Sequence, residues 1–370
     1  MNEKDTITIF HLSLFAITAI GLYNHVIIIS QILQMAGRDA WISVLIGLGF
    51  IFAWLPIFIF IRKETKQQHV FQWIKKHLGT FYYSIVLFLT MLYLVSILFI
   101  TIKETIVWTN ITYLQETSPF ILSTVLVSIC VFAALTSLRT IAITNFFILP
   151  FIIVFGFFVS FVNFQVKDFS LIQPVLEHGL EGPLKGAIYP VSGFLELIMV
   201  IMLQNKLEST FRLKHLYIIV FLLAWLTTGP LIGSIIEFGP KEAANQRFAA
   251  YEQWGLASLG IFIEHLDVLS IYQWMSGAFI RLSLLLFVVP HIFNVQKQMT
   301  KVFIIGLLGL SAIIFTLLPI GDIQYYQYLK NIIIPFSIGL NILIIIFIVL
   351  GILIYKIKKK VVKNEKVAKS

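Results

Sequence analysis

Two ionisable side chains near the centres of long apolar segments are the residues of this sequence best placed to do chemistry. Glu196 lies in the segment 183–205 and Arg281 in the segment 267–290. A charge at the centre of a membrane-spanning segment costs about 3 kcal/mol or more, so a partner or a ligand must stabilise it. We hypothesise that both side chains face one cavity, where they either pair directly or contact a solute. The alternative is a buried ion pair that only fixes two helices.

Further polar residues share helix faces with these charges. Gln273, Gly277 and Arg281 recur at i, i+4 and i+8, which predicts one polar stripe along their helix. Ser192 lies four residues before Glu196 and therefore shares its face. The pattern predicts that polar groups of two segments line the same cavity.

Two apolar segments are interrupted at corresponding positions, since Gly21 and Gly193 lie 172 residues apart. An interrupted helix frees peptide groups that lipid cannot satisfy, so the gap must face protein or a wet cavity. Inverted-repeat transporters bind solute at such gaps. The alternative is that Pro190 only kinks a packed helix and Gly21 only permits close helix contact. The candidate ligand-binding residues are Gly21, Asn24, His25, Tyr189, Ser192, Gly193, Glu196, Gln273 and Arg281.

Among these candidates, His25 has two interpretations. It could titrate or bind ligand, but a lone histidine beside a helix break is more often a satisfied structural group.

The elements that must position these residues are membrane-spanning helices. Of 370 residues, 59% are hydrophobic and 12% are charged, which is more apolar surface than a soluble domain could bury. The apolar runs are long enough to span the bilayer and lack the alternation of barrel strands. The sequence predicts an all-α integral membrane protein with about ten spans, at 8–33, 39–61, 80–108, 119–138, 140–163, 183–205, 215–236, 267–290, 301–319 and 331–355.

The chain divides into two halves of five helices. We predict a first repeat at 1–163, an extracellular connection at 164–182 and a second repeat at 183–355. The extracellular segment 237–267 is long enough for helices of its own, and a basic tail follows at 356–370. The mixed basic and apolar residues of 62–77 predict a short amphipathic helix on the inner surface.

The charge distribution predicts the orientation. The formal net charge is +9, and most basic residues fall on one side when both termini are placed in the cytoplasm, as the positive-inside rule requires. Lysines of the tail could contact anionic lipid, although solvated flanking charge also explains them. Basic residues do not form a stripe with interleaved aromatics, so a nucleic acid partner is not expected.

Motifs of enzymes and metal sites do not appear. The single Cys130 lies in an apolar run and offers neither a disulfide framework nor a thiolate cluster. No zinc-protease motif or nucleophile elbow occurs. We therefore expect no enzyme, no cofactor and no metal.

Five stretches of the sequence carry a family resemblance: DAWISVL at 39–45, YLQETSP at 113–119, LIQPV at 171–175, FGPKEAA at 238–244 and IEHLD at 263–267. Arg247, Tyr251, Trp274 and Arg281 accompany them. Together they resemble the spore germination permease family, the B subunits of nutrient germinant receptors.

This resemblance implies a branch of the amino acid-polyamine-organocation superfamily. It implies the LeuT-like inverted-repeat fold, with solute held where helices 1 and 6 are interrupted. It further implies a multi-pass protein of the spore inner membrane, beside the A and C subunits of the receptor. The function implied is detection of a nutrient such as an amino acid; an active, proton- or cation-coupled amino acid transporter is the alternative. A permanent charge at Arg281 would argue against sodium coupling.

Overall fold

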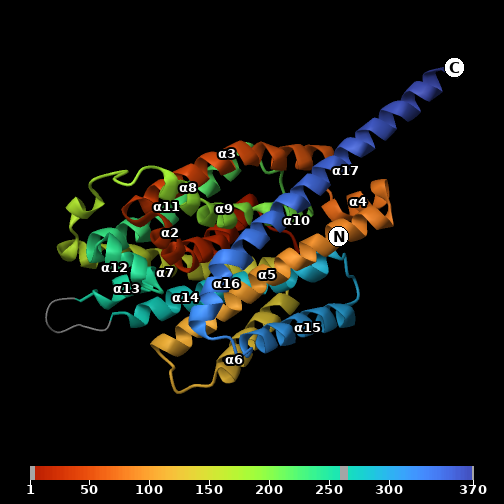
Figure 1. Cartoon of the computed structure of the whole chain (residues 1–370). Helices are drawn as coiled ribbons and strands as arrows, with labels where there is room; N and C mark the ends of the chain where they lie inside the picture. The colour runs from red at the N-terminus through yellow and green to blue at the C-terminus, as the bar shows by residue number, and fades with distance from the viewer. Residues whose placement is uncertain (1–4, 259–265, 369–370) are drawn as a thin grey trace.

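The computed structural model describes residues 5–258 and 266–368, and helices form nearly all of this part of the chain (Figure 1). Nine helical stretches of the described residues are long and apolar enough to cross a membrane, and α6 is a shorter apolar helix of 17 residues. The only β-pairing in the described part of the chain is one parallel bridge between Ile7 and Leu207. The prediction of an all-α membrane protein is confirmed.

The ten predicted spans correspond to these helical stretches, with boundaries shifted by a few residues. The first span comprises α1 (Ile9–Phe15), π-helical turns at Ala16–Ile20 and Tyr23–Ile27, and α2 (Ile29–Ala36). The sixth comprises α8 (Glu181–Gly186), α9 (Ile188–Leu195) and α10 (Ile198–Met202). The others are α3 (Ala40–Glu64), α5 (Thr80–Thr112), α6 (Pro119–Leu135), α7 (Leu138–Val162), α11 (Leu213–Phe238), α14 (Val268–Ile292), α15 (Gln298–Thr316) and, after α16 (Asp322–Tyr328) and a π-helical turn at Leu329–Ile333, α17 (Ile334–Ala368).

Large apolar side chains cover the outside of the bundle. Phe132 of α6 is 75% exposed and Phe161 of α7 is 82% exposed. Such side chains are stable on a surface solvated by lipid, whereas water would drive them together. α6 and α7 are therefore the peripheral, lipid-facing helices of the multi-pass protein.

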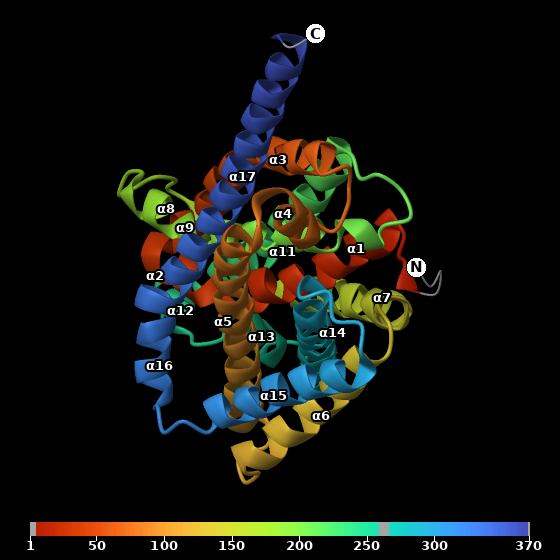
Figure 2. The same cartoon turned by 90° about the vertical axis from the view of Figure 1, so that its right-hand side faces the viewer.

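The centre of the bundle consists of the first and sixth spans and α14. α14 packs against α5, α6, α7 and α15, as Figure 2 shows when the bundle is viewed along its length. α3 packs on α11, and the first span contacts α7, α11 and α14. The predicted twofold relation between the halves 1–163 and 183–355 remains a prediction.

The first and last spans have their free ends on the same side of the bundle (Figure 1). There Lys206 forms an ion pair with Asp5, and the amide of Ile7 donates to the Lys206 carbonyl over 3.0 Å. The segment before α1 is thereby tied to the segment after α10. α17 is one helix of 35 residues, and its C-terminal part projects beyond the bundle.

The predicted amphipathic helix is α4 (Val70–Leu78). Its apolar residues Val70, Phe71 and Ile74 are buried, and the helix packs against α5 and α17. His69 is its N-cap: its Nδ1 accepts from the Gln72 amide at 3.4 Å, and its Nε2 contacts the carbonyl oxygen of His291 at 2.8 Å. The ring fits both contacts as a neutral imidazole protonated at Nε2.

Acid should therefore weaken this end of the bundle. Burial lowers the pKa of His69 below the usual 6.5, so the folded protein favours the neutral ring. Below pH 6.5 the unfolded chain then binds more protons, and the free energy of unfolding falls as the pH falls. Thermal unfolding in detergent micelles should start at a lower temperature at pH 5.5 than at pH 7.5. His69→Asn keeps an N-cap acceptor without a titratable ring and should reduce this pH dependence; an unchanged dependence would contradict the assignment.

Candidate functional site

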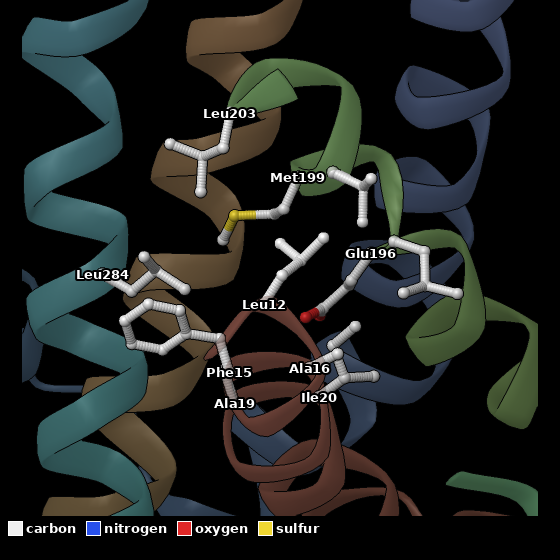
Figure 3. Close-up of a pocket in the computed structure, with 11 residues that line it drawn as sticks. Leu12, Phe15, Ala16, Ala19, Ile20, Glu196, Met199, Leu203 and Leu284 are labelled. Carbon is white, nitrogen blue, oxygen red and sulfur yellow. The ribbon is translucent and has the colours of Figure 1, made fainter. Parts of the chain in front are cut away.

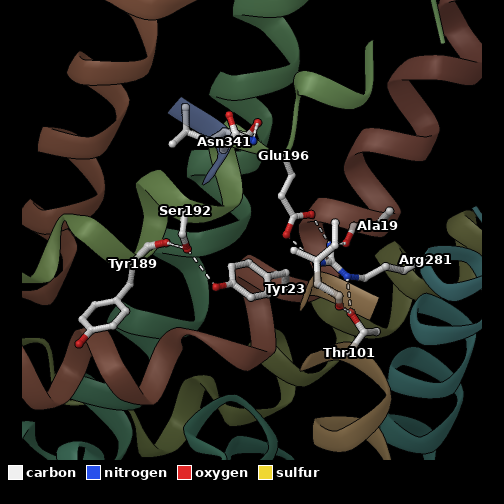
Figure 4. Close-up of polar contacts among 10 residues, drawn as sticks. Ala19, Tyr23, Thr101, Tyr189, Ser192, Glu196, Arg281 and Asn341 are labelled. Atoms are coloured by element: carbon white, nitrogen blue, oxygen red, sulfur yellow. Dashed lines mark hydrogen bonds and ion pairs between the residues drawn. The ribbon is translucent and has the colours of Figure 1, made fainter. Parts of the chain in front are cut away.

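Glu196 and Arg281 pair directly at the centre of the bundle (Figure 4). The carboxylate Oε2 lies 2.5 Å from Nη1 and Oε1 lies 2.6 Å from Nη2, a bidentate pair. Both side chains are almost completely buried. Of the two arrangements that the sequence left open, the structure has the direct pair.

The remaining donors of Arg281 bind two further elements. Nη1 donates to the carbonyl oxygen of Ala19 over 2.6 Å, and Nε donates to Thr101 Oγ1 over 2.8 Å. The guanidinium also lies 5.2 Å from the ring centroid of Tyr23, within reach of a cation–π interaction. Arg281 thus joins α14 to the first span, α5 and the sixth span.

The sixth span changes its hydrogen-bond pattern at Glu196. In a regular α-helix the amide of Met199 would donate to the Leu195 carbonyl, but here it donates to the Glu196 carbonyl over 3.0 Å. Asn341 Nδ2 of α17 donates to the Leu195 oxygen instead, over 3.0 Å. The interruption is therefore a short distortion whose freed carbonyl is satisfied by protein.

The first span is distorted in a different way, by π-helical turns. π-Helical turns occur mostly as local bulges, frequently at functional sites. The Ala19 carbonyl that receives Arg281 belongs to the first of them, and Tyr23 begins the second. Tyr23 Oη lies 3.0 Å from Ser192 Oγ, which donates in turn to the Tyr189 carbonyl over 2.6 Å. A polar chain thereby links the distorted parts of the two spans.

Asn24 and Gly193 are in contact where these spans meet. A Cβ atom at position 193 would overlap the Oδ1 of Asn24, so only glycine leaves room for the amide. The Asn24 side chain is fully buried, and neither Nδ2 nor Oδ1 has a hydrogen-bond partner among the described residues. Buried amides are nearly always paired, so this one is available to a bound molecule.

Three of the nine candidate residues face other elements. The Nδ1 of His25 contacts the carbonyl oxygen of Leu226 at 2.9 Å, and Gln273 Nε2 donates to the Ile152 carbonyl over 2.7 Å. Gly21 faces leucines of α11. Of the other six, Glu196 and Arg281 form the pair, Ser192 and the carbonyl of Tyr189 bond in a chain with Tyr23, and Asn24 and Gly193 are in contact. The Tyr189 ring points away from the pair (Figure 4).

A small apolar cavity lies beside the pair, on the side of the chain termini (Figure 3). Its volume is about 20 Å³, and Phe15, Ala19, Met199 and Leu284 line it together with Glu196. This volume holds about one water molecule. The centre of the bundle is thus closed in this conformation. Among the described residues, no group of three His, Cys, Asp or Glu side chains could hold a metal ion.

Sequence reasoning missed several residues of the site. Thr101 and Asn341 carry no charge and sit in apolar spans, so neither gave a signal before the fold was known. Glu104 did give one, as an acid within the third span, but it lies near the end of that span and not at its centre. In the structure Glu104 is fully buried, and the largely buried Lys103 Nζ donates to the Thr316 carbonyl over 2.8 Å.

Comparison with known proteins decides the family, because a family model described as "Spore germination protein" matches residues 5–324. The chain belongs to the spore germination permease family. Spore germination protein XB of Bacillus anthracis is 40% identical to this chain over 346 residues, which cover 92% of this chain and 97% of that protein. The chain is therefore a permease-like membrane protein of spore germination.

Two of the stretches that resemble the spore germination permease family join distant segments. Asp39 Oδ1 accepts from the amide of Leu176 at 2.9 Å. Tyr113 Oη donates to the carbonyl of Asp267 over 2.7 Å. Residues 263–265 of the last stretch lie outside the described residues.

The buried pair should dominate the stability of this permease. Removing one partner leaves an uncompensated buried charge, so Glu196→Gln or Arg281→Gln should lower the free energy of unfolding by about 3–5 kcal/mol. The double variant Glu196→Leu with Arg281→Met should lose less than the sum of the two single changes. Thermal unfolding in detergent measures this, with Lys185→Gln, which breaks an exposed ion pair, as the near-neutral control. Single variants as stable as the unmodified protein would show that the pair does not stabilise the fold.

Proposed function

We propose that this chain is the nutrient-sensing, permease-like B subunit of a spore germinant receptor. The solute binds where the first and sixth spans meet, in contact with Asn24 and Gly193. The observation that carries this proposal is the buried amide of Asn24, which has no partner in the part of the chain that the structure describes although it lies between two distorted helices.

The ion pair supports the site without binding the solute. Glu196 and Arg281 satisfy each other and the neighbouring Ala19 and Thr101, so neither charge is left for a ligand. A neutral amide offers two donors and an acceptor. It can therefore accept from the ammonium and donate to the carboxylate of an amino acid, which we propose as the nutrient class.

Binding requires the two spans to separate. The cavity beside Glu196 is about 20 Å³ and Asn24 does not line it, so an amino acid reaches Asn24 only when the two spans move apart. A solute that binds this open arrangement better than the closed one shifts the population toward it, which is the change a sensor needs. The A and C subunits would receive this change.

The surroundings follow from the same proposal. The protein lies in the spore inner membrane. Both termini lie in the cytoplasm, because most basic residues fall on the same side of the membrane as the termini. The segment with α12 (Pro240–Asn245) and α13 (Ala249–Gly255) then faces the outside. The two halves of the chain form an inverted repeat of the amino acid transporter type.

A coupled transporter is the second candidate, and the pair argues against it. A proton-coupled carrier needs a carboxylate that releases its proton on each side, and Glu196 is held by a permanently charged guanidinium. Purified protein in liposomes should bind but not concentrate labelled amino acids under an imposed proton or sodium gradient. Concentrative uptake by the isolated subunit would overturn the sensing function.

Changes at the Asn24–Gly193 contact should weaken the response to nutrient. Asn24→Ala removes two ligand hydrogen bonds and should raise the half-maximal nutrient concentration for germination by about tenfold, equivalent to about 1.4 kcal/mol. Gly193→Ala should act in the same direction because its methyl group displaces the amide.

The control is Asn331→Ala, whose exposed side chain bonds only to Gln327 among the described residues. Immunoblots must show equal amounts of each variant in the spore membrane. An unchanged dose response in Asn24→Ala spores would remove the binding site from this position.

A further inference from the structure

The segment 240–257 crosses the end of the bundle opposite the termini (Figure 1), and we call it the strap. It comprises α12, the linker 246–248 and α13. α12 packs against α2, and α13 packs against the first span and α11. The strap therefore covers the outer ends of the helices that form the candidate site.

Arg247 in the linker binds two acids from distant parts of the chain. Nη1 and Nη2 donate to Glu104 of α5 over 3.1 and 2.7 Å. Nε and Nη2 donate to Asp322 of α16 over 3.2 and 3.1 Å. One side chain of the strap thus joins the third span to the start of the last one.

The guanidinium and its backbone are held from further sides. Its carbon lies 4.5 Å from the ring centroid of Phe248 and 4.6 Å from that of Tyr326. Ser30 Oγ of the first span donates to the Arg247 carbonyl over 3.0 Å and accepts from the Ala249 amide at 3.3 Å. The linker is therefore anchored to the first span, to the third span and to α16 at the start of the last span.

An aromatic layer lies beneath the linker. Trp108 and Trp274 stack with centroids 4.2 Å apart, and Phe248 of the strap packs edge-on against Trp274 at 5.5 Å. Tyr251 packs against Trp108 at 5.7 Å. Leu22, which directly precedes Tyr23 of the site, belongs to the same buried cluster.

We propose that Arg247 is a latch that holds the strap closed over the solute site, so that nutrient enters only when its bonds to Glu104 and Asp322 break. This inference rests on the proposed binding site between the first and sixth spans. Because Glu104 is fully buried, releasing Arg247 leaves a carboxylate without its partner, which makes the open state costly until a ligand compensates. The latch therefore raises the free-energy cost of nutrient entry.

Arg247 keeps its charge, so a change of pH does not break the latch by changing the protonation of this arginine. Burial lowers the pKa of the Arg247 guanidinium, but attraction and hydrogen bonds from Glu104 and Asp322 outweigh burial and raise it above its usual value. Asp322 and Lys103 are the other charged groups near Glu104. The charge of Arg247 is thus permanent.

The latch can be tested without nutrient by cysteine labelling in detergent micelles. The background is Cys130→Ser, which removes the chain's single cysteine, with Ser192→Cys as a buried reporter under the strap. Arg247→Gln should increase the rate of maleimide labelling at position 192 at least tenfold. Arg247→Lys, which retains the charge but not the fork of donors, should give a smaller increase.

Two controls separate opening of the strap from unfolding. Ser283→Cys reports from a buried position on α14 on the other side of Arg281, and its labelling rate should stay unchanged in Arg247→Gln. Lys185→Gln removes an exposed charge at the same end and should leave position 192 protected.

If Arg247→Gln also exposes position 283, Asp322→Asn decides, since it breaks only the half of the latch that is partly exposed. Labelling at position 192 as slow as in the unmodified background in both variants would overturn the latch. That result would leave the binding site itself untouched, because its test is the dose response of Asn24→Ala.

Discussion

Everything at the centre of this protein depends on one bidentate ion pair in the middle of an apolar bundle. A single charge there is unstable, and Arg281 and Glu196 become tolerable only because each neutralises the other and the remaining donors reach Ala19 and Thr101. The pair fixes α14, α5 and the distorted parts of the first and sixth spans relative to each other. The distorted parts carry the buried polar groups of Tyr23, Ser192 and Asn24, so the proposed site lies beside the pair that holds the helices.

The closed arrangement is maintained at both ends of the bundle by ion pairs between segments far apart in sequence. Asp5 and Lys206 join the segment before α1 to the segment after α10 at the end of the termini. At the opposite end Arg247 joins the strap to Glu104 of α5 and Asp322 of α16. The cavity beside Glu196 is about 20 Å³, which is too small for an amino acid. The closed arrangement therefore depends on electrostatic contacts, each of which can be broken separately.

The sequence predicted the helical spans, because uninterrupted apolar runs admit no other structure in lipid. It also predicted that Glu196 and Arg281 face one cavity, but it left open whether they pair directly, as the structure shows, or contact a solute. The sequence did not predict which helices the uncharged polar side chains face. Gln273 shares a helical face with Arg281 by spacing, yet it bonds to α7, and His25 bonds to α11. In the first span, π-helical turns change the register by a residue, so a face derived from regular spacing no longer holds past them. Gln273 lies in the regular helix α14, where the spacing holds but the side chain finds its acceptor on α7. Arg247 comes from a loop, whose partners depend on tertiary packing alone.

The length of α17 has a mechanical consequence. Asn341 binds the carbonyl freed at the break of the sixth span, and the helix then continues without interruption to Ala368. At 1.5 Å per residue this distance is about 40 Å, and the far part of the helix projects beyond the bundle (Figure 1). A tilt of about 5° at Asn341 therefore moves the tip by about 3.5 Å on that length. A small movement beside the proposed solute site is thus amplified at the C-terminal end of the helix.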